Sequence, residues 1–258
     1  MVMPKKYPGT LVYNRRWRKR QHYVAPYYKY GLELGIYSDT MDLIVKELVK
    51  RIKNNYQNVI HFSGDPGSGK STCTIQMIQR LAKALKVDFD LPNDYIYTPD
   101  DLWNKLRMEN PTPIFFFDEA SVTLNSLSYR GSDDRDIVSI IETMRSRGYN
   151  IFLVSPTFGN INAKVRRNYV DFRVECSSDK TPLRWGSTAY GRGFFEFKER
   201  VPPRKDGDDP NWNLLTTGTF DELDAETDSI YQPIKSQHQN VLVDRAIKRN
   251  MKQYEEEA

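Results

Sequence analysis

The stretch GDPGSGKS, residues 64–71, decides the fold because it satisfies the pattern G-x-x-x-x-G-K-[ST]. An apolar segment at 58–63 predicts a strand before it, and helically spaced apolar residues predict a helix over 70–85 after it. A strand, a glycine-rich turn and a helix in this order build a loop whose backbone N–H groups point inward around phosphates. We therefore predict an ATP-binding loop here. The residues predicted to contact the nucleotide are Gly64, Asp65, Pro66, Gly67, Ser68, Gly69, Lys70, Ser71 and Thr72.

Two acidic residues complete the predicted site. The apolar run IFFF, residues 114–117, predicts a buried strand that ends in Asp118 and Glu119. In sheets of this kind the carboxyl end of the strand lies beside the phosphate loop. We expect Asp118 and the Ser71 hydroxyl to hold Mg²⁺, and Lys70 to reach the outer phosphates. Glu119 is the predicted group that orients or deprotonates the attacking water, which favours hydrolysis over transfer to a bound alcohol.

Strands and helices alternate along the chain. Beyond the segments above, we predict strands over 95–97, 150–154 and 169–176, and helices over 40–55 and 136–147. Another helix follows Thr98, its predicted N-cap, and stops before Pro111. This alternation predicts a three-layer α/β P-loop fold with a mainly parallel central sheet. After Cys176 we predict a hairpin over 183–200 turning near 190–193, a loop over 202–213, a helix over 234–254 and a charged tail.

Charge is unevenly distributed, which suggests three parts: an N-terminal arm (1–36), the core (37–178) and a C-terminal extension (179–258). Residues 1–30 hold eight Lys or Arg and no acid, whereas residues 206–258 hold twelve acids and five bases. Tyrosines and a tryptophan alternate with the bases of the arm, a mixture that suits nucleic-acid strands. The alternative is an arm packed on the core or on a neighbouring subunit.

Composition narrows the class of protein. The chain has 258 residues and two cysteines, Cys73 and Cys176, too few for a secreted disulfide framework or a four-cysteine zinc site. The apolar runs are far shorter than the roughly 20 residues of a spanning helix, and the first residues do not form a secretory signal. We expect a protein of the cytoplasm, or of the host cytoplasm if it is viral.

The motifs GDPGSGKS, IFFFDEA, ETMRSRGYNIFLVSP and NAKVRRNYVDFRVEC resemble those of the FtsK and HerA group of P-loop ATPases, over residues 58–176. The resemblance implies the additional-strand, catalytic-glutamate class and a homo-oligomeric ring, commonly a hexamer. It also implies an arginine that reaches the γ-phosphate of the neighbouring subunit, with Arg145 or Arg147 as the expected residue. The competing arginines are Arg130, Arg166, Arg167 and Arg173.

One departure from the family pattern falls after the strand at 150–154. Where the family places a glutamine, this chain has Pro156, so we expect the hydroxyl of Ser155 or Thr157 to sense the γ-phosphate. Zot-like phage assembly ATPases are similar in these motifs too, but they usually carry a membrane segment. The small size is more similar to viral or plasmid packaging ATPases.

These observations favour a ring-forming, Mg²⁺-dependent ATPase that moves double-stranded DNA, in packaging or transfer of a viral or plasmid genome. A second hypothesis is an ATP-switched nucleic-acid-binding or assembly factor that pumps nothing, and a third is a kinase of small molecules or nucleotides. The loop SLSYRGSDDR, 126–135, is interpreted as a kinase lid or as a pore loop in which Tyr129 and Arg130 contact a threaded strand.

Overall fold

The computed structural model describes residues 38–121, 124, 134–178, 193–201 and 210–256. The chain divides into two compact units, one of Met1–Phe89 with Asp94–Glu222 and the other of Asp90–Asn93 with Leu223–Ala258. The predicted basic arm (1–36) and the predicted loop contacts Tyr129 and Arg130 lie outside the described residues. Among the described helices, none has both the length and the apolar character needed to cross a bilayer.

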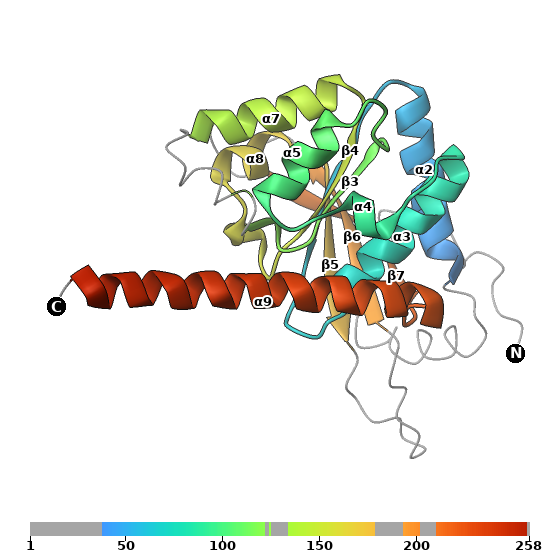
Figure 1. Ribbon diagram of the computed structural model, residues 1–258. Coiled ribbons are helices and arrows are strands. Elements are labelled where there is room, and N and C mark those ends of the chain that lie inside the picture. Colours follow the sequence, from blue (N-terminus) through green and yellow to red (C-terminus); the bar gives the residue numbers. More distant parts are fainter. Residues whose placement is uncertain (1–37, 122–123, 125–133, 179–192, 202–209, 257–258) are drawn as a thin grey trace, which may run out of the picture. The chain divides into compact units, whose positions relative to one another are not determined.

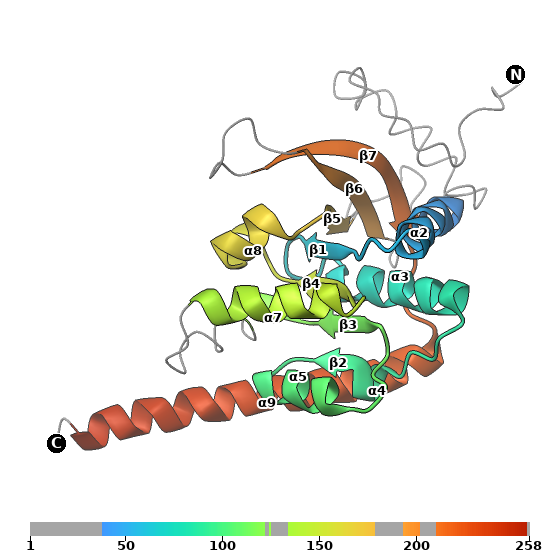
Figure 2. The same ribbon diagram turned by 90° about the horizontal axis from the view of Figure 1, so that it is seen from above.

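The first unit is built on one mixed sheet (Figure 1). Its described strands are β1 (Val59–Ser63), β2 (Tyr95–Ile96), β3 (Ile114–Phe117), β4 (Asn150–Val154), β5 (Phe172–Ser178), β6 (Gly193–Val201) and β7 (Asn211–Phe220). Their order is β2-β3-β4-β1-β5-β6-β7, which Figure 2 shows across the sheet. Strands β1 to β5 pair in parallel, and β6 and β7 continue the sheet in antiparallel pairing. The predicted α/β class with a mainly parallel sheet is confirmed.

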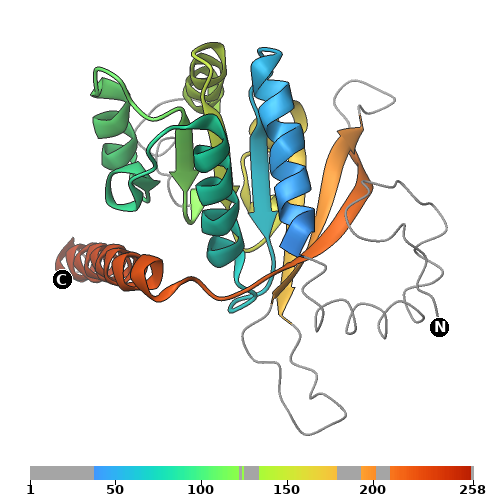
Figure 3. The same cartoon turned by 90° about the vertical axis from the view of Figure 1, so that its right-hand side faces the viewer.

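Helices cover both faces of this sheet. The described helical segments of the first unit are α2 (Ser38–Lys53), α3 (Lys70–Leu85), α5 (Pro99–Arg107), α7 (Asp134–Ser146), the 3₁₀ turn η2 (Phe158–Asn160) and α8 (Ala163–Asn168). Most of the short helix α4 (Leu91–Asp94) belongs to the second unit. Helices α2 and α3 lie on one side of the sheet, and α7 and α8 on the other (Figure 2). Strands β6 and β7, in orange, are inclined to the parallel strands in Figure 3.

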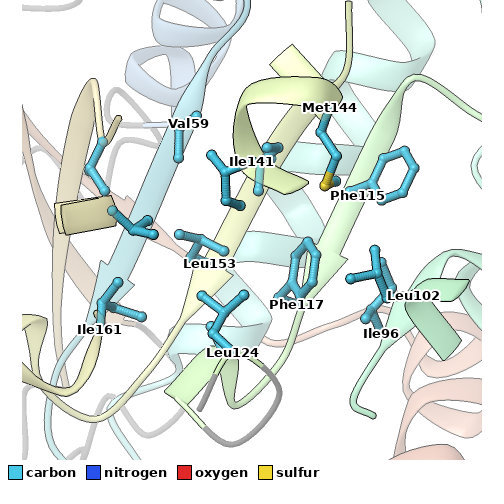
Figure 4. Close-up of a cluster of buried hydrophobic side chains, with 14 residues drawn as sticks. Val59, Ile96, Leu102, Phe115, Phe117, Leu124, Ile141, Met144, Leu153 and Ile161 are labelled. Carbon is cyan, nitrogen blue, oxygen red and sulfur yellow. The ribbon is translucent and has the colours of Figure 1, made fainter. Parts of the chain in front are cut away.

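Alternate residues of the buried strands face the two helical layers. Phe115 and Phe117 of β3 join a cluster with residues of α5, α7 and α8, and Figure 4 shows it between sheet and helices. Phe116 falls between them and, by the two-residue period of a strand, faces the α3 side. Because both faces are covered, every residue of β1, β3 and β4 is buried, and β3 is an unbroken apolar run.

The start of α5 follows the predicted chemistry. The Thr98 hydroxyl accepts from Asp101 N (3.3 Å), and the Asp101 carboxylate accepts from Thr98 N (2.7 Å), with Pro99 in the first turn. This reciprocal capping box satisfies backbone donors that the helix itself leaves unpaired. The predicted N-cap at Thr98 is confirmed.

The predictions after Cys176 need correction. Of the hairpin predicted over 183–200, the second strand is present as β6, but it pairs with β5 and β7 on its two sides. Residues 183–192, predicted as the first strand and the turn, lie outside the described residues. The predicted loop over 202–213 is too long, since β7 already begins at Asn211. Such long-range pairing of partly exposed strands leaves a weak periodicity in the sequence.

The second unit contains helix α9 (Ala225–Glu256), which begins nine residues before the predicted start at 234 and continues through Pro233. Asp224 stands at its start, where the carboxylate accepts from Thr227 N (2.8 Å). The helix also includes Glu255 and Glu256, which the sequence suggested as part of an unstructured charged tail.

Candidate active site

The glycine-rich loop joins β1 to α3, as predicted. Gly64, Gly67 and Gly69 have φ of 152°, 77° and 79°, values that side chains rarely allow. At Gly64 an added Cβ would also lie 2.2 Å from the carbonyl oxygen of Cys176, so only glycine fits there. Gly64 N donates to Pro156 O (3.2 Å), which ties the loop to the end of β4. These glycines therefore allow the loop backbone to turn its N–H groups inward, as binding of a phosphate requires.

Lys70 lies across the beginning of this loop. Its ammonium group donates to the carbonyl oxygens of Gly64 and Asp65, each at 2.9 Å. Lys70 is also the first residue of α3, where the positive end of the helix dipole lies. The cation, the helix start and the loop N–H groups thus share one place, which favours an anion with several charges.

Asp118 and Ser71 meet beside the loop. The Ser71 hydroxyl donates to Asp118 Oδ1 (2.9 Å), so the first turn of α3 is joined to the carboxyl end of β3. Asp118 is 1% exposed, and its Oδ2 accepts from the Tyr95 hydroxyl (3.1 Å). A hydroxyl and a carboxylate oxygen are hard donors of the kind Mg²⁺ prefers, and P-loop magnesium sites take few protein ligands. The residues present therefore fit the ion predicted for this place.

Glu119 has a strained backbone. Its φ is 57°, in the left-handed region, at a cost of roughly 1–2 kcal/mol for a residue with a side chain. The residue is half-buried, directly after the buried Asp118. Burial first, and then the charges of Glu119 and Asp118, raise the pKa of Tyr97 to about 12. The Tyr97 phenol thus remains neutral near these carboxylates.

The end of β4 is fixed by a buried polar chain. The Ser155 hydroxyl donates to Thr157 O (2.7 Å) and lies 2.7 Å from His61 Nε2 of β1. Because Ser155 uses its proton in this bond, His61 donates from Nε2. Burial, and then the charge of Arg173, lower the pKa of His61 to about 3, so the ring is neutral. Ser155 is fully buried and Thr157 exposed, and the sensor role of either hydroxyl stays a prediction.

The arginines predicted to act in a neighbouring site lie at the opposite edge of the sheet. Arg145 ends α7, where its guanidinium lies 3.8 Å from Asp171 Oδ1. Asp171 Oδ2 accepts from Val59 N (3.0 Å), at the start of β1. The length of β1, roughly 16 Å at 3.3 Å per residue, thus separates Arg145 from its own phosphate loop. Arg147 is exposed next to it. A catalytic role for either in a neighbouring subunit stays a prediction.

The competing arginines have other neighbours. Arg173 forms an ion pair with Glu175 (2.6 Å) and lies over the Phe158 ring (4.8 Å), which Arg166 also approaches (5.7 Å). The carbonyl oxygen of Arg167 accepts from Arg200. Arg130 lies outside the described residues.

Several residues near the loop were missed by the sequence analysis. Tyr95 lies in β2 and Tyr97 directly follows it; the sequence predicted a strand over 95–97 but no role for either tyrosine. Phe220, at the end of β7, lies where a Cβ on Gly69 would come within 2.6 Å of its ring. Gln76 of α3 donates to Asp221 O (2.6 Å), so the end of β7 is bound to the helix that follows the loop. No local pattern indicated this contact.

A glycine-rich loop on a mainly parallel sheet, with its lysine bonded to the loop carbonyls and its serine bonded to the strand-end aspartate, defines a P-loop nucleoside triphosphatase. The chain belongs to the Novel STAND NTPase 3 family, whose sequence profile matches residues 44–181, just over half of the chain. It matches none of the curated proteins.

Solved structures offer distant likenesses. One is the N-terminal domain of zonular occludens toxin from Neisseria meningitidis, at 16% identity and a TM-score of 0.38, over 67% of this chain and 98% of that chain. Another is the pilus retraction motor PilT with bound ADP, at 15% identity and a TM-score of 0.32, over 79% of this chain and 59% of that chain.

Proposed function

We propose that the chain is an Mg²⁺-dependent ATPase that couples hydrolysis to movement of double-stranded DNA. The observation that carries the catalytic part is the 2.9 Å bond between Ser71 and Asp118, directly before the strained Glu119. The sheet order supports the additional-strand class, because β4 lies between the loop strand β1 and the strand β3 that ends in Asp118.

The chemistry divides among residues of the chain. Loop N–H groups and Lys70 bind the β- and γ-phosphates and stabilise charge that develops on them. Ser71 and Asp118 would hold Mg²⁺, which when bound neutralises phosphate charge. Glu119 orients a water molecule whose oxygen attacks the γ-phosphorus while the bond to the bridging oxygen of ADP breaks. The proton of that water passes to the Glu119 carboxylate.

Arg145 and Arg147 lie where the parallel strands begin, which we call the amino edge of the sheet; the carboxyl edge is where these strands end. This position suits action in a ring. Arg145 and Arg147 are remote from their own loop, so a guanidinium from this edge would serve the site of a neighbouring subunit. In related chemistry such an arginine contributes about 10³–10⁵ in rate. Support for DNA as the substrate comes from the basic, aromatic segment 1–30 and from the resemblance to DNA-pumping ATPases. A motor of this kind would act in the cytoplasm, in packaging or transfer of a viral or plasmid genome.

The test of the motor is ATP turnover by the full chain with Mg²⁺, with and without linear double-stranded DNA. We expect DNA to stimulate turnover and small phosphate acceptors to have no effect. Turnover indifferent to DNA, without DNA binding at low salt, would overturn the motor. DNA binding without translocation of a labelled duplex would favour the ATP-switched factor, and dependence on an acceptor would favour a kinase.

Subunit mixing tests the trans arginine. Arg147→Ala subunits keep their own loop, and Lys70→Ala subunits keep the arginine, so each variant alone is expected to be inactive. Mixed rings should recover turnover where a Lys70→Ala subunit supplies Arg147 to an Arg147→Ala neighbour. The same mixture with Arg145→Ala distinguishes the two arginines. Full activity of both Arg→Ala variants alone would contradict the assignment.

A further inference from the structure

We propose that Tyr95 is a positioning residue for the metal ligand Asp118, and that its hydroxyl sets the affinity of the site for the divalent cation. This inference rests on the proposed Mg²⁺-dependent hydrolysis and deepens it. The observation behind it is that the two oxygens of the Asp118 carboxylate have different hydrogen-bond partners. Oδ1 faces the Ser71 hydroxyl at 2.9 Å, and Oδ2 accepts from the Tyr95 hydroxyl at 3.1 Å.

The fold holds the Tyr95 ring firmly. Tyr95 is 3% exposed and pairs in register with Phe116 of β3, whose ring it meets edge-on at 5.5 Å and 80°. It also stacks with the ring of Tyr97, just after β2, at 6.1 Å and an interplanar angle of 5°. Asp118 N donates to Ile96 O (3.2 Å), so the backbone of the aspartate is tied to the same short strand. The distance between phenol and carboxylate is therefore set by sheet pairing.

The physical consequence concerns rotation of the carboxylate. A carboxylate that lies at a strand end can turn about its Cβ–Cγ bond unless something holds it, because that torsion is broad. The phenol fixes Oδ2, which keeps Oδ1 directed at the Ser71 hydroxyl. A phenol donates a hydrogen bond without adding charge, so it orients the carboxylate without placing a competing cation beside it. Hydrogen bonds that orient a metal ligand in this way typically contribute 10- to 100-fold in metal affinity.

The test compares Tyr95→Phe with Tyr149→Phe. The first substitution removes the hydroxyl and keeps the ring contacts with Phe116 and Tyr97. The second removes a hydroxyl from a ring that lies 4.7 Å from the Phe115 ring at an interplanar angle of 34°, just before the start of β4. Mn²⁺ serves as the probe, and its binding in the presence of a non-hydrolysable ATP analogue is followed by electron paramagnetic resonance. Binding of the analogue alone is measured in EDTA.

We expect Tyr95→Phe to weaken Mn²⁺ binding by about 10- to 100-fold and to leave binding of the analogue in EDTA unchanged. Tyr149→Phe should change neither. Mn²⁺ affinity of Tyr95→Phe within twofold of the unsubstituted chain would overturn the proposal, as would equal losses in both measurements, because those indicate a general structural role. The readout needs no turnover, so a chain that binds Mn²⁺ but hydrolyses nothing would defeat the proposed function and still decide the role of Tyr95. A chain that binds the analogue and never Mn²⁺ would defeat both.

Discussion

The acidic side chains at the two ends of the parallel strands have different partners. At the amino edge, Asp94 lies 2.7 Å from the ammonium of the buried Lys105, and Asp171 lies 3.8 Å from both Arg51 and Arg145. At the carboxyl edge, the buried Asp118 accepts hydrogen bonds from two hydroxyls, those of Ser71 and Tyr95. Cationic partners compensate an acid within the fold, whereas hydroxyls orient it and leave its charge in place. From this comparison we expect substitutions at the amino edge to change stability and substitutions at the carboxyl edge to change the proposed cation-dependent hydrolysis.

The largest expected effect comes from breaking the carboxyl edge at Gly64. An added Cβ would meet the Cys176 carbonyl at 2.2 Å, a contact with backbone that cannot move aside, so Gly64→Ala should abolish detectable nucleotide binding. Gly67→Ala is the matched control, since φ is 77° there but nothing lies within 4 Å of the added atom. It should cost roughly 1–2 kcal/mol from the backbone alone. Binding of a fluorescent ATP analogue measures both, and equal affinities would contradict the account of the loop.

Substitutions at the amino edge should lower the free energy of unfolding and leave nucleotide binding unchanged. Lys105→Met leaves the buried Asp94 carboxylate without its lysine, which typically destabilises by about 3–5 kcal/mol. Urea denaturation should show this loss, and Lys105→Met/Asp94→Asn should recover part of it. Lys50→Met, in an exposed pair with Glu47 at 3.8 Å, should cost less than about 1 kcal/mol. A folded Lys105→Met chain that no longer binds nucleotide would contradict the expectation that the amino edge contributes only stability.

His61 gives a smaller, pH-dependent effect. Its pKa is about 3 in the folded chain and ordinarily 6.5, because burial disfavours the charged ring and Arg173 adds to this. Below about pH 6.5 the unfolded chain therefore binds a proton that the folded chain does not. The free energy of unfolding should fall by about 1.4 kcal/mol per pH unit between pH 6 and 4 from this residue.

Comparison with His61→Gln isolates this slope, because every other titrating group is common to both chains. Unfolding midpoints at pH 7, 6 and 5 should converge for the two chains as the pH falls. Parallel pH profiles would show that His61 can take up its proton inside the fold.

Local chemistry made much of the fold predictable. The loop, the apolar run before Asp118, and the capped helix after Thr98 each carry their signal within a few residues. The strands and helices predicted up to Cys176 therefore lie within about three residues of the observed ones, whereas the short helices α4 and α8 were not predicted. Residue type and spacing alone predicted that Ser71 and Asp118 share a site, and the structure brings the two side chains together. Their role as metal ligands stays a prediction.

What the sequence could not predict depends on contacts between distant segments. Tyr95 and Asp118 are 23 residues apart and meet because β2 pairs with β3. The sequence predicted a strand over 95–97, but nothing in it indicated which strand would be its neighbour. Phe220 reaches Gly69 through the antiparallel strands β6 and β7, whose partly exposed residues resemble a loop in composition. Pairing of this kind is decided by the assembled sheet, so it leaves little trace in any one segment.

The most direct test of the central claim is the rate of ATP hydrolysis by Glu119→Gln, with Mg²⁺ and saturating nucleotide. If the carboxyl edge performs the chemistry and Glu119 takes the proton of the attacking water, turnover should fall by about 10²- to 10⁴-fold. Binding of a non-hydrolysable analogue should stay unchanged, and Glu47→Gln on the exposed face of α2 should hydrolyse at the normal rate. Turnover of Glu119→Gln within a factor of three of the unsubstituted chain would contradict the claim.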